Sequence, residues 1–157
     1  MRIITAESAM YEINEDRLEP VGQIQLQVSI GIPGTNKFSK PFAANYDPGA
    51  AGHASIILPM ALLKELGLAD KLPLLNVSEA EMADGSIEQE LETLISLRLT
   101  TIPFGQSVIF DGIRCVVSRG AKADGTLIGM SVWRYFDVVM QNSTIRMLNL
   151  SAKLPER

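Results

Sequence analysis

The sequence predicts a mostly β domain with one or two short helices, and three features support this expectation. From Gln23 to Ile30, polar and apolar residues alternate with period two, the pattern of a strand with one buried face. A partial alternation of the same kind runs from Ile87 to Leu99. The best helix candidate is short, Met60 to Leu66; Pro59 suits its first position and Gly67 suits the residue just past its end.

The remaining expected elements are also short. After turn residues that follow Ile30, a returning strand is expected from Phe38 to Tyr46. Val108 to Val117 is expected to form two strands around a hairpin turn at Asp111-Gly112, a dipeptide typical of such turns. Towards the end of the chain we expect a short helix within 131–136 and a final strand or hairpin within 138–148.

Composition excludes several classes of function. The chain has 157 residues, enough for one domain with a real core, and a net charge of -4, which gives no reason to expect nucleic acid or a membrane as partner. Its longest apolar-rich run, Ile56 to Leu63, is too short to cross a bilayer, and the first residues do not resemble a secretory signal. The one cysteine, Cys115, excludes an internal disulfide and a multi-cysteine metal site. We therefore expect a cytoplasmic protein without metal or cofactor.

One carboxylate lies in a distinctive setting. Asp47-Pro48-Gly49-Ala50 forms a tight turn sequence directly after a short apolar stretch. Late in the chain, Leu127-Ile128-Gly129-Met130 places two bulky apolar residues before a glycine. Asp-Pro-Gly alone is a common structural turn, so the tetrapeptide by itself favours no chemistry.

Three further segments resemble parts of one protein family and occur along the chain in the same order as in that family. Residues 55–68 resemble the strand, Leu-Pro and short helix ending in Leu-Gly-Leu that follow the active-site turn in prokaryotic retropepsin-like aspartic proteases. Met82-Ala83-Asp84-Gly85-Ser86 is similar to the tip of their flap, and 127–130 is similar to the apolar-apolar-Gly element beside their active-site loop. The resemblance covers roughly residues 22 to 148 and implies a closed all-β barrel that forms a homodimer.

The resemblance also implies a chemistry. Each subunit would supply one Asp47, and two carboxylates that share one proton have separated pKa values, so that one acts as base and the other as acid on a water. Gly49 and Ala50 would shape the turn, while Leu127, Ile128 and Gly129 would support the loop. The flap residues Met82, Ala83, Asp84, Gly85 and Ser86 would close over an extended peptide substrate and pair with its backbone.

Pro48 departs from the family pattern, which has Thr or Ser at this place. Proline has neither the hydroxyl that braces the two loops across the dimer axis nor an N–H donor, and it restricts the backbone of Asp47. Losing one hydrogen bond per subunit would cost about 0.5 to 1.5 kcal/mol each. The sequence therefore leaves open an aspartic endopeptidase, a non-catalytic peptide-binding or dimerisation module of the same shape, and a monomeric barrel of unrelated function.

The domain division expected from the sequence has three parts. Residues 1–21 are an arm or extra hairpin, 22–150 the retropepsin-like domain, and 151–157 a frayed tail. The lone His53 is expected in a loop, because one histidine cannot build a zinc site. Cys115 is expected to be a buried thiol, and Asp124-Gly125 to be a turn without chemistry.

Overall fold

The computed structural model describes residues 2–7, 11–14, 17–20, 25–52, 55–81, 84–100, 107–121, 125–141 and 144–149. Its strands are β1 Arg2–Glu7, β2 Tyr11–Asn14, β3 Arg17–Pro20, β4 Gln25–Gly31, β5 Phe42–Tyr46, β6 Ile56–Pro59, β7 Leu74–Glu81, β8 Ile87–Thr100, β9 Ser107–Ser118, β10 Leu127–Ile128, β11 Phe136–Gln141 and β12 Thr144–Asn149. Its helices are α1 Met60–Glu65 and α2 Met130–Trp133. The mostly β class with two short helices is thus confirmed.

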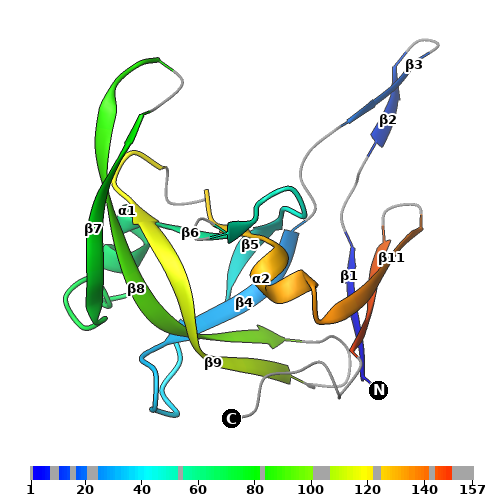
Figure 1. Ribbon diagram of the computed structural model, residues 1–157. Coiled ribbons are helices and arrows are strands. Elements are labelled where there is room, and N and C mark those ends of the chain that lie inside the picture. The colour runs from blue at the N-terminus through cyan, green and yellow to red at the C-terminus, as the bar shows by residue number, and fades with distance from the viewer. Residues whose placement is uncertain are drawn as a thin grey trace.

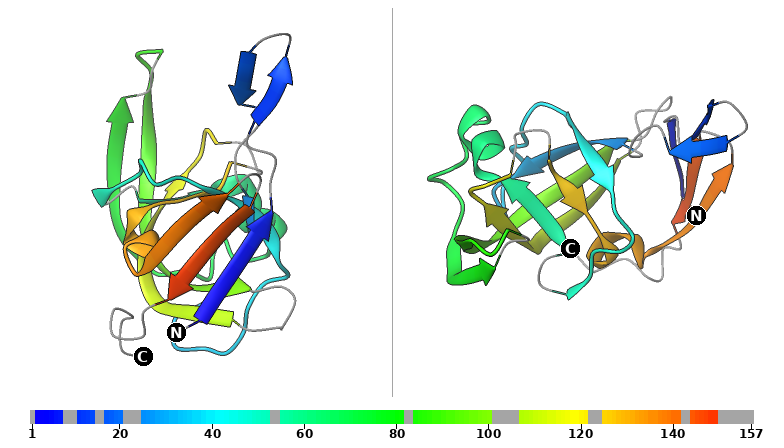
Figure 2. Two further views of the ribbon diagram at one scale, coloured as in Figure 1. Left: turned by 90° about the vertical axis from the view of Figure 1, so that its right-hand side faces the viewer. Right: turned by 90° about the horizontal axis from the view of Figure 1, so that it is seen from above.

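The central feature is a closed barrel (Figure 1). Its strands follow the order β4-β5-β10-β6-β9-β8, and β8 pairs back onto β4, where Val28 lies opposite Leu99. β7 pairs only with β8, so the β7–β8 hairpin extends beyond the barrel, as Figures 1 and 2 show. Closure removes the free edges that an open sheet would leave around the core.

Alternation along β4 and β8 explains the barrel interior. Val28 and Ile30 of β4, with Ile95, Leu97 and Leu99 of β8, are all at most 2% exposed, as expected for inward positions with period two. Aromatic rings complete the core on the side of α2: Trp133 lies 5.2 Å from Tyr46 and 6.1 Å from Phe136 between ring centroids.

The prediction of a hairpin turn at Asp111-Gly112 is wrong. β9 runs unbroken through these residues and pairs with β8 along its length. The register shifts because Ile95 faces Ile113 while Leu97 faces Phe110, so two residues of β9 lie opposite the single Ser96. The pair is therefore a β-bulge, in which Gly112 supplies the positive φ of 72°.

Two expected boundaries shift slightly. Pro59 ends β6 and is the N-cap of α1, so the helix begins at Met60 as expected. It ends at Glu65, one residue before the expected Leu66, and Gly67 follows with a φ of 71°. The returning strand begins at Phe42, and Phe38 forms only an isolated bridge with Gly31.

The chain ends form sheets of their own. β1 pairs with β12, which pairs with β11, and β2 pairs with β3 in a separate hairpin (Figure 2).

Several residues for which the sequence made a prediction lie outside the described ones, namely His53, Met82, Ala83, Asp124 and the tail 151–157. In the part of the chain that is described, no helix is long and apolar enough to cross a membrane.

Candidate active site

Asp47 begins a four-residue turn directly after β5. The backbone N–H of Ala50 donates to the carbonyl oxygen of Asp47 at 3.2 Å, which closes the turn with Pro48 second and Gly49 third. A proline is favoured at the second position because its fixed φ already matches the turn. The turn therefore accommodates Pro48 in its backbone.

The carboxylate of Asp47 is held by its own turn. Its Oδ1 accepts a hydrogen bond from the N–H of Gly49 at 3.1 Å, and the N–H of Asp47 donates to the carbonyl of Ile128 at 3.0 Å. The side chain is half-buried, and among the described residues it forms no ion pair. Asp47 is thus held by backbone hydrogen bonds and remains partly exposed.

β10 lies between the two strands that flank this turn. It is parallel to β5, with Ile128 opposite Tyr46, and antiparallel to β6, with Ile128 opposite Ile56. The indole Nε1 of Trp133 donates to the Ile128 carbonyl and fixes the point where β10 ends. The sequence elements 47–50 and 127–130 are therefore brought together.

Three consecutive N–H groups after β10 then clamp the loop. Gly129 donates to the Ser55 carbonyl at 2.6 Å, Met130 to the Ala50 carbonyl at 2.8 Å, and Ser131 to the Ser55 hydroxyl at 2.8 Å. A Cβ on Gly129 would lie 2.4 Å from the Ala50 oxygen and 2.6 Å from the Ser55 oxygen, so only glycine fits here. We call these contacts the loop clamp; sequence reasoning missed the part played by Ser55.

Comparison with known proteins identifies this architecture. No protein-family model and no curated protein matches the chain. Among solved structures, a retropepsin-like aspartic protease from Rickettsia conorii aligns over 93% of this chain and 98% of its own, with a TM-score of 0.51 and 19% sequence identity. The fold is retropepsin-like. At this identity the likeness establishes the fold, which confirms the closed barrel expected from the sequence.

In this retropepsin-like fold, the β7–β8 hairpin carries the residues predicted as the flap. Gly85 turns the tip with a φ of 83°, and Asp84 Oδ1 accepts hydrogen bonds from the Ser86 hydroxyl at 2.5 Å and the Ser86 N–H at 2.9 Å. These bonds hold the pKa of Asp84 below its ordinary value. Among the described residues, no hydrogen bond joins this tip to Asp47 or its turn.

Burial also shifts the pKa values of two groups outside the turn, Cys115 and Tyr46. Burial raises the pKa of the Cys115 thiol to about 12, so the thiol stays protonated at neutral pH and acts as a small core side chain. Burial also raises the pKa of Tyr46, which precedes Asp47. No group of three or more metal-ligating side chains occurs among the described residues.

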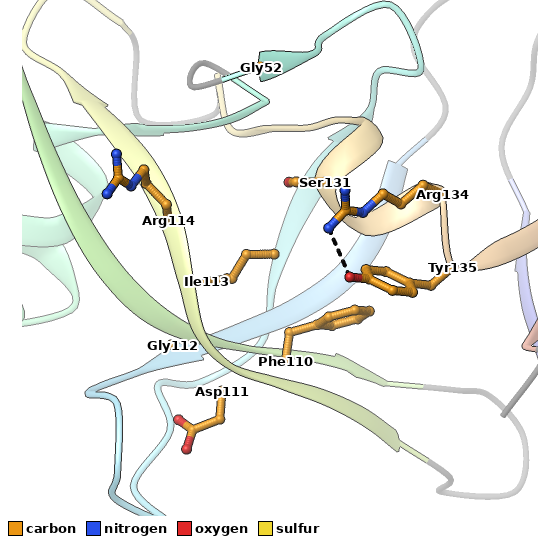
Figure 3. A pocket seen from close by; sticks show the side chains of 9 residues that line it. All are labelled: Gly52, Phe110, Asp111, Gly112, Ile113, Arg114, Ser131, Arg134 and Tyr135. Carbon is orange, nitrogen blue, oxygen red and sulfur yellow. Dashed lines mark hydrogen bonds between the residues drawn. The ribbon is translucent and has the colours of Figure 1, made fainter. Parts of the chain in front are cut away.

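A pocket of about 290 Å³ lies beside the loop but does not include Asp47 (Figure 3). Its lining contains Gly52 from the loop that follows Asp47 and Ser131 from α2, and the rest comes from 110–114 of β9 and from Arg134 and Tyr135 just after α2. Asp47, Pro48, Gly49 and Ala50 do not line it. Sequence reasoning gave no sign of this pocket.

Proposed function

We propose that the protein is an aspartic endopeptidase in which two copies of the chain each contribute Asp47. The observation that carries the proposal is the setting of this carboxylate: Asp47 is half-buried, its Oδ1 accepts from the Gly49 N–H, and the loop clamp holds the end of its turn at Ala50. Two such carboxylates at close range share one proton, and the resulting base and acid activate a water for attack on a peptide carbonyl. The retropepsin-like fold supports this reading.

The proposal also gives a role to the turn residues, to the element that supports the turn, and to the β7–β8 hairpin. Gly49 and Ala50 shape the turn, and Leu127, Ile128 and Gly129 keep it in place. The flap around Asp84, Gly85 and Ser86 closes over an extended peptide and pairs with its backbone as an added strand. The reaction needs no metal or cofactor, since the dyad itself supplies both proton donor and acceptor.

One observation favours a second function. Pro48 is exposed and carries no hydroxyl, so the turn has no side-chain donor at this position to brace a second copy. Small displacements of a reacting group lower a rate steeply. On this alternative the chain is a peptide-binding or dimerisation module with the retropepsin-like shape and little or no catalysis.

Peptide-library cleavage between about pH 3.5 and 7, followed by mass spectrometry, separates the two functions. The wild type is compared with Asp47→Asn and with Asp70→Asn, a matched control at an exposed site outside the turn. The endopeptidase predicts cleavage by the wild type and the control and none by Asp47→Asn. Dimers of all three proteins without cleavage would favour the module, and equal cleavage by all three would remove Asp47 from the mechanism.

A further inference from the structure

A pocket between β9 and α2 has the chemistry of a ligand site that is separate from the proposed catalytic turn. It has a volume of about 290 Å³, close to the lower end for small-molecule sites. Gly52 is its one contact with the loop that follows Asp47. What binds here therefore need not occupy the place of a scissile peptide.

The floor of the pocket is apolar and partly aromatic. The ring of Phe110 lies 5.7 Å from that of Tyr135 between centroids, and Ile113 points from β9 towards α2 (Figure 3). Phe110 is 1% exposed, so its ring belongs to the core, while Ile113 and Tyr135 are half-buried and offer surface to a ligand. This floor suits an aromatic or branched aliphatic group.

Arg134 brings a positive charge to the pocket. The Arg134 guanidinium lies over the Tyr135 ring, 4.9 Å from its centroid, and donates to the Tyr135 hydroxyl at 2.8 Å. It has no carboxylate partner among the described residues. An arginine has five N–H donors in a planar fork, so most of those on Arg134 remain available to an acid.

Arg114 also lines the pocket, but its side chain extends away from Ile113, Arg134 and Tyr135 in Figure 3. It forms an ion pair with Glu92 at 3.6 Å and is 59% exposed. The carboxylate of Asp111 is turned away from the other side chains in Figure 3 and accepts hydrogen bonds from the Ser96 hydroxyl and from the N–H of Gly34.

We propose that this pocket binds a carboxylate attached to an aromatic or aliphatic body, with the acid on Arg134 and the body on Ile113 and Tyr135. Two kinds of ligand combine a carboxylate with an apolar group in this way. One is a free small carboxylic acid, and the other is a peptide in which an acidic side chain lies beside an apolar one. The inference does not rest on the proposed peptidase activity, because binding alone tests it.

The test uses amide-resolved NMR titration of the full chain with 3-phenylpropionate and its neutral analogue 3-phenylpropanamide. We expect saturable shifts at Gly112, Ser131 and Tyr135 with low millimolar affinity for the acid, and at least about tenfold weaker binding of the amide, since a charge-assisted hydrogen-bond pair is lost. The capped dipeptide acetyl-Phe-Glu-amide is titrated in parallel, and whichever acid binds more tightly identifies the source.

Two variants test whether Arg134 supplies the positive charge that binds the acid. Arg134→Gln is expected to weaken binding of the acid about tenfold, whereas Arg98→Gln is a matched control, because Arg98 also lies over a ring, that of Phe38 at 4.5 Å, but outside the pocket. Equal affinity for acid and amide would overturn the proposal without any variant, as would shifts that do not saturate. Equal weakening by both variants would show only a general effect of surface charge and would overturn it too.

Discussion

In the proposed dimer, Pro48 occupies the turn position from which a threonine would present a hydroxyl to the second copy of the chain. Its backbone fits the turn, so Pro48→Thr is expected to leave the fold intact and to add one hydrogen bond per subunit. Each bond contributes about 0.5 to 1.5 kcal/mol, so the dimer dissociation constant should fall by about fivefold or more. Sedimentation velocity over a dilution series measures the change, and an unchanged constant would contradict a role for this residue between subunits.

Gly129 is the residue on which the loop clamp depends. Gly129→Ala would place a methyl group against the backbone oxygens of Ala50 and Ser55, neither of which can move without displacing the turn. We expect a loss of about 1 to 3 kcal/mol in the free energy of unfolding, the usual cost of overpacking. Urea unfolding measures it. Gly120→Ala is the control: its close neighbour is the Glu88 carboxylate, a flexible group that can swing aside, so a loss as large as that of Gly129→Ala would refute this explanation.

The structural role of some single residues can be predicted from the sequence, and that of others cannot. Asp-Pro-Gly-Ala indicates a turn because its geometry depends on neighbours within four residues. Ser55 gives no such signal, since its hydroxyl acts on the N–H of Ser131, which is 76 positions away. Arg134 and Tyr135 line the pocket with 110–114 of β9 only because the fold brings these distant segments together, and no local pattern encodes that arrangement.

At the scale of elements, Asp111-Gly112 shows why a local pattern can mislead. The dipeptide favours positive φ in a hairpin and in a bulge alike, and the long partner strand β8 decides between them. In the bulge, the Asp111 carboxylate accepts from the hydroxyl of Ser96, which is 1% exposed, and from the N–H of Gly34.

The bulge makes a testable prediction for β8 and β9. Asp111→Ala removes the acceptor of the buried Ser96 hydroxyl and should lower the free energy of unfolding by about 1 to 3 kcal/mol. Asp111→Asn keeps an oxygen at the same place and should cost less than half as much. Thermal and urea unfolding of both variants measure this difference, and equal losses would show that the hydrogen bonds are not the cause.

The tip of the β7–β8 hairpin, at Asp84 to Ser86, is expected to show a pH dependence. The Ser86 hydrogen bonds lower the folded-state pKa of Asp84 below its unfolded value, so their stabilisation of the tip is present above the unfolded pKa and is lost as pH falls through the folded pKa. NMR titration of the Asp84 carboxyl should give a pKa below the model-peptide value, and Ser86→Ala should raise it towards that value. A pKa that does not respond to Ser86→Ala would mean that another group controls it.

For the whole molecule, the closed barrel followed from a family resemblance rather than from alternation. Alternation located β4 and β8 but could not say that β8 closes onto β4, because pairing between distant strands is decided by packing of the complete core. The same limit applies to β1 and β12, which pair although they lie at opposite ends of the chain. Local patterns therefore located single strands, but the pairing of strands that are distant in the chain did not follow from them.

The proposed function requires two chains, because each supplies one Asp47. A wild-type subunit paired with an Asp47→Asn subunit would have a broken dyad and no activity. If subunits exchange freely, a ninefold excess of Asp47→Asn should reduce the cleavage by a fixed amount of wild type to about one tenth, since only about one wild-type subunit in ten then has a wild-type partner. An equal excess of Asp70→Asn should instead raise the total cleavage. Suppression by Asp47→Asn alone is the signature of a shared active site, whereas additive activities would mean that each chain works by itself and that the dyad does not exist.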